Sequence, residues 1–460
     1  MLFNSTLYLA FLIVVATAFH QLGAPGRRAL LALASYAFYW VWSVPFSLLL
    51  VGSTLVDYTA ARVIAAARRP ATKRLALVAS LVFNLGILAL FKYADFFSQA
   101  SLDLFGVQPW PHLGWVLPLG ISFYTFQTMS YTIDVYRGRL PAHRSFVDIA
   151  LYVSFFPQLV AGPIVRADVL LPQLRCEPGP VDWDAIRRGI GLVVYGLVKK
   201  VVFADGVAHL VNEVYAAPGG VSGLGLLVAT YGFAVQIYCD FSGYSDIAIG
   251  SALLLGIRLP ENFDRPYLST SITEFWRRWH LSLSSWLRDY LYIPLGGNRR
   301  GRVRTYVNLM LTMLLGGLWH DAGWNWVVWG GLNGLFLSAE RLLDVGERPR
   351  SRARAALQML WTFHVVCLTW VFFRADDLPT AWLVIERIAT WAPGTMPISL
   401  WPLAATAAVL LADLSDARAH WVSFCSAHPV FVRVLAYGAL LVFGLVFTEV
   451  ENPEFIYFQF

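Results

Sequence analysis

Residues 304–341 read RTYVNLMLTMLLGGLWHDAGWNWVVWGGLNGLFLSAER, two apolar runs that meet at a short polar turn. Each run is long enough for a helix, so the stretch predicts a helical hairpin with His320 at its turn. Basic residues flank both ends of the hairpin, which places both ends in the cytoplasm by the positive-inside rule. His320 lies sixteen residues beyond Arg304, or roughly 24 Å along a helix, which would put it deep in a bilayer.

The composition of the whole chain indicates an integral membrane protein. Hydrophobic residues make up 57% of the 460 and charged residues only 14%. Apolar runs of roughly 17–25 residues recur, whereas a membrane β-barrel would show shorter alternating segments. We therefore predict an all-α, polytopic transmembrane protein, a single domain over residues 1–460 with roughly eleven membrane elements.

The expected membrane helices are separated by basic connections or by proline and glycine. We place them at residues 3–20, 29–44, 46–66, 75–98, 114–136, 187–210, 222–257, 355–374, 396–413 and 430–449, besides the hairpin. The broken piece Ala150–Arg166 is expected to be re-entrant or interfacial, and 378–391 interfacial. The basic connections are assigned to the cytoplasm, so the N-terminus is predicted to be extracytoplasmic.

Several other classes of protein fit the sequence poorly. The net charge of +6 is spread over short basic clusters between apolar runs, a pattern that does not favour nucleic-acid binding. The four cysteines are widely spaced, with no C-x-x-C pair, so neither a disulfide framework nor a zinc site is predicted. The run Leu2–Phe19 has no basic region before it and is interpreted as a retained first helix rather than a signal peptide.

Two carboxylates occur inside the long apolar stretch 222–257. Charged groups in a membrane segment are costly, so Asp240 and Asp246 must be paired, face a water-filled cavity, or serve the function. One alternative is structural, in which both carboxylates bond backbone amides at a helix break near Gly243. The other is a role in catalysis or substrate binding.

A second histidine follows in the stretch that begins at Thr273. Its apolar residues recur at helical spacing and predict one amphipathic helix near the cytoplasmic surface, ended by the Pro294–Gly297 segment. The residues on its apolar face are Trp276, His280, Leu283, Leu287 and Leu291. A lone histidine on such a face is more often a buried structural residue, so His280 becomes a site candidate only if other groups converge on it.

His320 is the stronger candidate for chemistry. An imidazole ionises near neutral pH and is the usual side chain for removing a proton from a hydroxyl nucleophile. We find no serine hydrolase elbow, phosphate-binding glycine loop or metal-spaced histidine cluster elsewhere in the sequence. The residues alone leave two interpretations open, a catalytic His320 and a histidine that caps the turn.

Taken as a whole, the sequence resembles the membrane-bound O-acyltransferase superfamily, in particular its bacterial alginate O-acetyltransferase branch. The resemblance is carried by MLFNS (1–5), LPLGISFYTFQTMSYTIDVYRG (117–138), FFPQLVAGPIVR (155–166), YCDFSGYSDIAIG (238–250), EFWRRWHLSLSSWLRDYLYIPLGGNR (274–299), GGLWHDAGWNWVVWG (316–330) and FIYFQF (455–460). It implies an enzyme that moves an acyl group onto a hydroxyl, with membrane helices around a central funnel. His320 then matches the invariant histidine of the superfamily, and His280 the second polar residue of its active site.

Two positions depart from that pattern. Many relatives have glycine where this chain has Asp321 and a later histidine where it has Asn333, and asparagine cannot take up a proton near neutral pH. Either the later histidine is not needed for the chemistry, or the activity has changed.

The resemblance also suggests substrates and partners. Acetyl-CoA is the expected acyl donor, with no bound cofactor or metal, and its phosphates suit Arg277, Arg278 and the basic residues at 299–304. Further candidates for substrate or donor contact are Trp319, Asp240, Asp246 and Asn325. His280 would orient the thioester or stabilise the developing oxyanion.

The expected setting is the bacterial inner membrane, where an extracytoplasmic acetyltransferase partner would modify an exported polysaccharide such as alginate. Alternative acceptors are peptidoglycan, cellulose, teichoic acid or a lipid. The non-enzymatic alternative is a transporter or an export scaffold that catalyses no reaction.

Overall fold

The computed structural model describes residues 1–460 apart from 161, 176, 178, 345–350, 397–398 and 448–460. Within this part of the chain the protein is helical, and the β-structure consists of an isolated bridge between Val221 and Thr395. The predicted all-α class is confirmed. The chain divides into two compact units, residues 1–190 with 248–260, and residues 191–247 with 261–460. The expectation of a single domain stays a prediction.

The first unit contains the N-terminal helices. They are α1 (Thr6–Gln21), α2 (Ala24–Trp40), α3 (Val44–Ala66), α4 (Pro70–Leu88), α5 (Ala94–Phe105), α6 (Ile121–Tyr136), α7 (Phe146–Ser154), α8 (Phe156–Leu159) and α9 (Ala167–Leu170). α10 (Trp183–Val198) and α12 (Gly223–Leu254) each contribute residues to both units.

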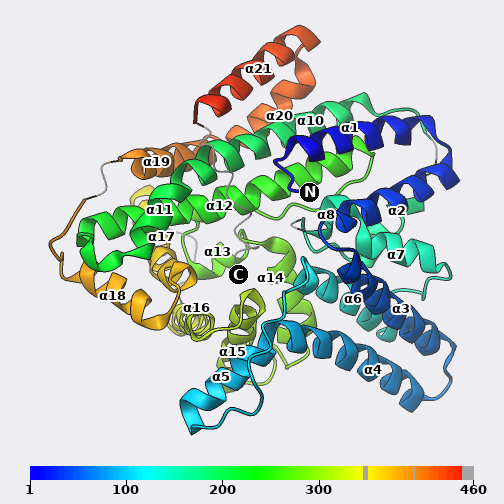
Figure 1. Ribbon diagram of the computed structural model, residues 1–460, viewed down its shortest axis with the longest axis horizontal. Helices are drawn as coiled ribbons and strands as arrows, with labels where there is room; N and C mark the ends of the chain where they lie inside the picture. The colour runs from blue at the N-terminus through cyan, green and yellow to red at the C-terminus, as the bar shows by residue number, and fades with distance from the viewer. Residues whose placement is uncertain (161, 176, 178, 345–350, 397–398, 448–460) are drawn as a thin grey trace. The chain divides into compact units, whose positions relative to one another are not determined.

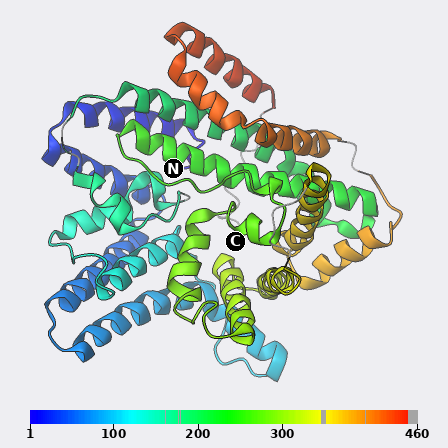
Figure 2. The ribbon, with the colours of Figure 1, turned by 180° about the vertical axis from the view of Figure 1, so that it is seen from behind.

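A buried carboxylate ties together three helices of the first unit. α3, α4 and α6 pack side by side, the blue to cyan helices in Figure 2. Asp57 of α3 accepts hydrogen bonds from Ser80 and Asn84 of α4 and, at 2.8 Å, from Thr132 of α6. Because these donors satisfy its oxygens, a carboxylate can be buried here.

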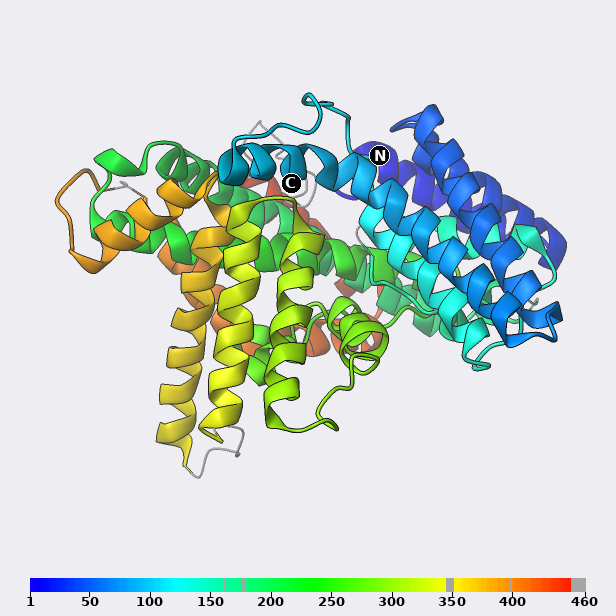
Figure 3. The same cartoon turned by 90° about the horizontal axis from the view of Figure 1, so that it is seen from below.

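The second unit contains all the residues that the sequence singled out as site candidates. Its other helices are α11 (Gly206–Ala216), α13 (Ile272–Trp276), α14 (Leu281–Leu287), α15 (Arg302–His320), α16 (Trp324–Leu342), α17 (Arg352–Arg374), α18 (Leu378–Ala389), α19 (Trp401–Leu414), α20 (Ala417–Ala427) and α21 (Val430–Phe447) (Figure 1). The predicted hairpin is confirmed as α15 and α16, and Figure 3 shows α15, α16 and α17 as three long helices in a row.

The described residues include several apolar helices of the kind that the sequence predicts. Four helices are long and apolar enough to cross a membrane, namely Val44–Ala66, Pro70–Phe105, Gly223–Leu254 and Arg352–Arg374. Shorter apolar helices lie at Thr6–Gln21, Trp401–Leu414 and Val430–Leu440. The count of eleven elements stays a prediction, and so does the depth of His320, because α15 is not one of the four.

Some predicted boundaries were wrong. The segment expected at 75–98 continues as one helical rod to Phe105, through a π-helical turn at Ala89–Tyr93. The stretch between the helices expected at 396–413 and 430–449 holds α20. The break predicted within 150–166 is seen in its described residues, while the re-entrant or interfacial placement stays a prediction. α7 ends at Ser154, and the short α8 follows, with Pro157 in its first turn. Proline lacks an amide hydrogen and favours such a restart.

The helix break proposed near Gly243 is wrong, because α12 is continuous from Gly223 to Leu254. Gly243 instead permits a close approach to α10. A Cβ on Gly196 would lie 2.5 Å from the carbonyl oxygen of Gly243, and one on Gly243 would lie 2.8 Å from that of Gly196. The part of α12 that carries Asp240 and Asp246 therefore packs as an unbroken helix against α10.

Candidate functional site

His280 lies between two short helices and not on the face of a single helix. The helix predicted from Thr273 onward ends at Trp276, and α14 begins only at Leu281. His280 has left-handed backbone angles, φ 45° and ψ 55°, which a non-glycine residue adopts only when its surroundings hold it there. The prediction of one continuous helix is wrong, and His280 is fully buried at the break.

Asn262 supplies the contacts that hold this break. Its backbone carbonyl accepts the amide hydrogen of Leu281 at 2.9 Å, and its side-chain oxygen accepts the amide of Ser282 at 3.2 Å. The Ser282 hydroxyl donates to the same oxygen at 2.9 Å, and Nδ1 of His280 lies 3.2 Å from it. These bonds replace those that a continuous helix would make, which is the physical reason for the break.

The environment of His280 is aromatic. Its ring lies edge-on to Phe241, with 4.6 Å between ring centroids, and also contacts Phe263 and Trp319. The side chain is fully buried, and burial lowers the pKa of His280 to about 3. The imidazole is therefore neutral at physiological pH.

His320 is the last residue of α15 and is also buried among aromatic rings. Trp329 of α16 and Phe373 of α17 contact its ring edge-on, at centroid distances of 5.1 and 5.3 Å. Trp326 stacks on it at 6.0 Å. Three helices thus fix the orientation of this imidazole.

Trp319 connects the two histidines. Its ring centroid lies 6.0 Å from that of His280 and 5.1 Å from that of His320. The structure therefore brings into one site two histidines that are forty residues apart in the sequence. Trp319, predicted as a substrate contact, is buried and forms the wall between them.

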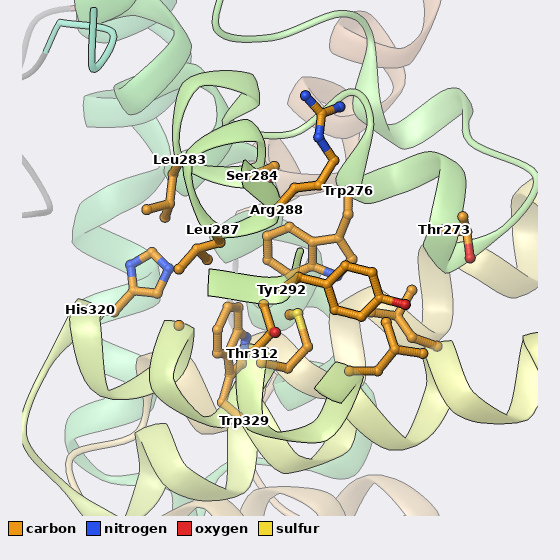
Figure 4. A pocket seen from close by; sticks show the side chains of 14 residues that line it. Thr273, Trp276, Leu283, Ser284, Leu287, Arg288, Tyr292, Thr312, His320 and Trp329 are labelled. Atoms are coloured by element: carbon orange, nitrogen blue, oxygen red, sulfur yellow. The ribbon is translucent and has the colours of Figure 1, made fainter. Parts of the chain in front are cut away.

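A pocket of about 230 Å³ opens beside His320 (Figure 4). His320 lies at one end, while Thr273 and Tyr292 lie toward the other. The accessible lining is almost entirely apolar, as expected for a ligand site with a few polar groups. The lining residues are Thr273, Trp276, Leu283, Ser284, Leu287, Arg288, Tyr292, Leu309, Thr312, Met313, Gly316, His320, Trp329 and Leu337.

The arginine that lines this pocket is Arg288, which the sequence analysis did not select. Its guanidinium also pairs with Asp289 at 2.7 Å. Arg278 is engaged elsewhere, by Glu274 at 2.7 Å, and Arg277 is exposed. Arg277 and Arg278 were chosen because a basic cluster suits phosphates, but the pocket lining depends on how the helices pack and includes Arg288 instead.

Asp240 and Asp246 are held in ion pairs. Lys200 is buried and lies 2.9 Å from Asp240, while Asp246 binds Lys199 at 2.6 Å and Arg418 at 2.7 Å. Both lysines lie in the π-helical segment Lys199–Asp205 between α10 and α11. These contacts support the structural interpretation of the two carboxylates, with lysines rather than backbone amides as their partners.

Two other singled-out asparagines hold helices in place. Asn325 is buried and donates to the carbonyl oxygen of Ala375 at 2.6 Å. Asn333 donates to the carbonyl of Trp329 and accepts the indole hydrogen of Trp276 at 3.3 Å. Asn333 thus positions a tryptophan of the pocket wall through hydrogen bonds alone, which requires no titrating group. Asp321 follows α15 in an extended conformation.

The described residues include no group of three or more His, Cys, Asp or Glu side chains that could hold a metal ion. The cysteines among them, Cys239, Cys367 and Cys425, are free and buried. What the site does offer is one imidazole, His320, in the lining of an apolar pocket and a second, His280, on the other side of Trp319. Such an arrangement can move a proton to or from a nucleophile while excluding water.

Comparison with known proteins identifies the family of this chain. The probable alginate O-acetylase of Pseudomonas aeruginosa is 44% identical over 85% of this chain and 76% of its own length. That of Azotobacter vinelandii is 41% identical over 97% of this chain and 85% of its own length. The peptidoglycan O-acetyltransferase of Helicobacter pylori is 37% identical over 90% and 84%. Since residues 81–375 also match the family described as MBOAT, the chain belongs to the membrane-bound O-acyltransferase family.

Proposed function

We propose that this membrane acyltransferase moves acetyl groups from acetyl-CoA toward the O-acetylation of an exported polysaccharide, with alginate as the first candidate acceptor. The observation that carries the proposal is the position of His320 at the end of an apolar pocket, joined to His280 through Trp319. The relatives named for alginate O-acetylation are 41 to 44% identical to this chain.

In the proposed reaction, the acyl acceptor is a hydroxyl group of the polysaccharide or of a carrier. Its oxygen attacks the thioester carbonyl of acetyl-CoA while His320 takes the hydroxyl proton. The carbon–sulfur bond then breaks, and the proton passes from the imidazole to the departing thiolate. The products are an acetyl ester and free CoA, so no net proton or electron is consumed.

The apolar pocket is suited to the thin, largely uncharged arm that carries the thioester. Arg288 at its lining, and the exposed Arg277, supply positive charge for the phosphates of the donor. We accordingly assign Arg277 and Arg288 to donor binding, and His320 and His280 to catalysis. Asp240, Asp246 and Asn325 are assigned to the support of the surrounding helices.

We place the protein in a bacterial inner membrane with its N-terminus outside the cytoplasm, and we expect an extracytoplasmic acetyltransferase to receive the acetyl group. The basic connections support this orientation. Reporter fusions at Ala67 and Gly106 test it. They should report cytoplasmic and extracytoplasmic positions respectively, and the reverse pattern would refute the orientation.

Peptidoglycan is the second candidate acceptor, because the Helicobacter pylori relative is named for it. Acetyl esters on isolated alginate and on isolated peptidoglycan distinguish the two candidates. Membership of an acyltransferase family also argues against the alternative of a transporter without chemistry.

The test of the proposed function is His320→Ala in membrane-folded protein, with release of CoA thiol from acetyl-CoA and O-acetyl content of the polymer as readouts. Loss of a general base typically costs about 100-fold or more in rate. His364→Ala is the matched control, since His364 is exposed and its Nε2 contacts Tyr231. Unchanged acetylation in His320→Ala, or equal loss in both variants, would refute the assignment.

A further inference from the structure

The orientation of the Asn262 side-chain amide follows from its contact with a backbone N–H group, which can only donate a hydrogen bond. The backbone amide of Ser282 always donates, and it lies 3.2 Å from the position assigned to Oδ1 of Asn262. If the amide group were flipped, its NH₂ would face this N–H, and two hydrogen-bond donors would meet. The other end of the amide donates to Ser245 at 3.3 Å. The oxygen of Asn262 therefore points at His280.

This orientation fixes which ring nitrogen of His280 carries the proton. Nδ1 lies 3.2 Å from the Asn262 oxygen, which can only accept. If Nδ1 carried no hydrogen, its lone pair would face a lone pair of the Asn262 oxygen in a buried site. The Ser282 hydroxyl does not relieve this conflict, because its bond to Asn262 at 2.9 Å is shorter than its 3.4 Å contact with Nδ1. Nδ1 thus bears the hydrogen, and Nε2 bears the lone pair.

The backbone conformation at His280 also favours the tautomer with the hydrogen on Nδ1. His280 has a left-handed conformation, held by the bonds from Leu281 and Ser282 to the backbone and side chain of Asn262. Rotation of the imidazole would give up the Nδ1 contact, and Asn262 itself is buried. One residue therefore fixes both the place of the imidazole and its tautomer.

We infer that Asn262 is a positioning residue that holds His280 as the neutral Nδ1–H tautomer, with the lone pair on Nε2. With its hydrogen on Nδ1, His280 can accept a hydrogen bond at Nε2. It does not donate to the oxygen of the thioester, the role that the sequence suggested. This inference deepens the proposed acyl transfer and rests on it for the role of Nε2, whereas the tautomer itself is independent of the reaction.

The immediate test is NMR of purified protein containing ring-¹⁵N-labelled histidine. Signals of bare and protonated ring nitrogens are well separated, and His280→Gln identifies the signals of His280. We expect a protonated Nδ1 and a bare Nε2 in the wild type, and a mixture of tautomers in Asn262→Ala. A protonated Nε2 in the wild type would overturn the inference, and this measurement requires no folded variant at position 262.

The kinetic test is Asn262→Asp, which keeps the acceptor but adds a negative charge beside Nδ1. An opposite charge at this distance stabilises the imidazolium and raises its pKa by roughly 1 to 3 units. Among the described residues, Phe241, Phe263, Trp319 and Ser282 contact the ring, and none of these four side chains is charged. Since protonation removes the Nε2 lone pair, the acidic limb of the kcat profile should move to higher pH by a similar amount.

Asn308→Asp is the matched control, because Asn308 is buried and donates to the carbonyl of Gly297 rather than to a histidine. Its pH profile should match the wild type. An Asn262→Asp profile equal to that of the control, in protein that melts normally, would contradict the inference. If wild-type protein releases no CoA although its tautomer is as expected, the proposed function fails and the positioning by Asn262 stands.

Discussion

Gly330 of α16 lies against Met313 of α15 so closely that a Cβ on the glycine would be 2.4 Å from the carbonyl oxygen of Met313. One turn nearer to His320, a Cβ on Gly317 would lie 2.2 Å from the carbonyl oxygen of Trp326. No side chain fits at such distances, so the two backbones are in direct contact. This contact fixes the hairpin that presents His320 to the pocket.

Substitution of Gly330 by alanine should therefore force the hairpin apart. Overpacking of this kind typically costs about 1 to 3 kcal/mol, and we expect a lower melting temperature together with loss of CoA release. Gly331→Ala is the control, because its nearest neighbour, a methyl group of Leu314, would lie at an ordinary 3.7 Å. Equal melting temperatures for the two variants would show that the glycine contact does not hold the hairpin.

Asp246→Asn should destabilise the protein without a specific effect on donor binding. The substitution leaves Lys199 and Arg418 without their shared carboxylate, and breaking a buried pair costs about 3 to 5 kcal/mol. Asp184→Asn is the control, since Asp184 pairs with Arg188 in an exposed i,i+4 contact worth about 0.5 kcal/mol. Thermal melting measures the difference. A raised KM for acetyl-CoA in Asp246→Asn at a temperature where it is folded would instead indicate contact with the donor.

His280 should make the protein less stable in mild acid. Its pKa is about 3 in the folded protein and near 6.5 when exposed, so the unfolded chain takes up the proton first as the pH falls. The contribution of the neutral histidine is complete above pH 6.5 and is lost progressively down to about pH 3. Between pH 6.5 and 5 this amounts to about 2 kcal/mol.

Comparison of thermal melting at the two pH values checks this expectation. His280→Gln should lose less stability than the wild type between pH 6.5 and 5, because glutamine does not titrate. The exposed His364→Gln should behave as the wild type does. Identical pH dependence in His280→Gln and the wild type would be incompatible with a buried neutral imidazole.

A larger side chain at Thr312 should block the pocket. Thr312 lies on α15 and lines the pocket beside His320, so a phenylalanine there would occupy space assigned to the donor arm (Figure 4). We expect the KM for acetyl-CoA to rise at least about tenfold, the equivalent of 1.4 kcal/mol of lost binding. Val307→Phe, at an exposed position of the same helix, should leave the KM unchanged. Normal kinetics in Thr312→Phe would exclude this pocket as the donor site.

The sequence was most informative where local physics decides the structure. The long apolar runs and the short turn after His320 predicted the helical class and the α15–α16 hairpin, and both are confirmed. It was less informative where tertiary contacts override local preference. A helical pattern continues through residues 273–291, yet the contacts of Asn262 break the helix at His280.

By itself the sequence identified the two histidines and the family motifs, because side-chain chemistry and spacing are written directly in it. Only the tertiary structure decided what surrounds them. It placed Trp319 between the histidines, Arg288 at the pocket and lysines beside the aspartates of α12. The physical reason is that hydrogen bonds and ion pairs between distant residues depend on how the helices pack. The oxygen of Asn262 facing Nδ1 of His280 is such a contact, and no periodicity along the chain encodes it.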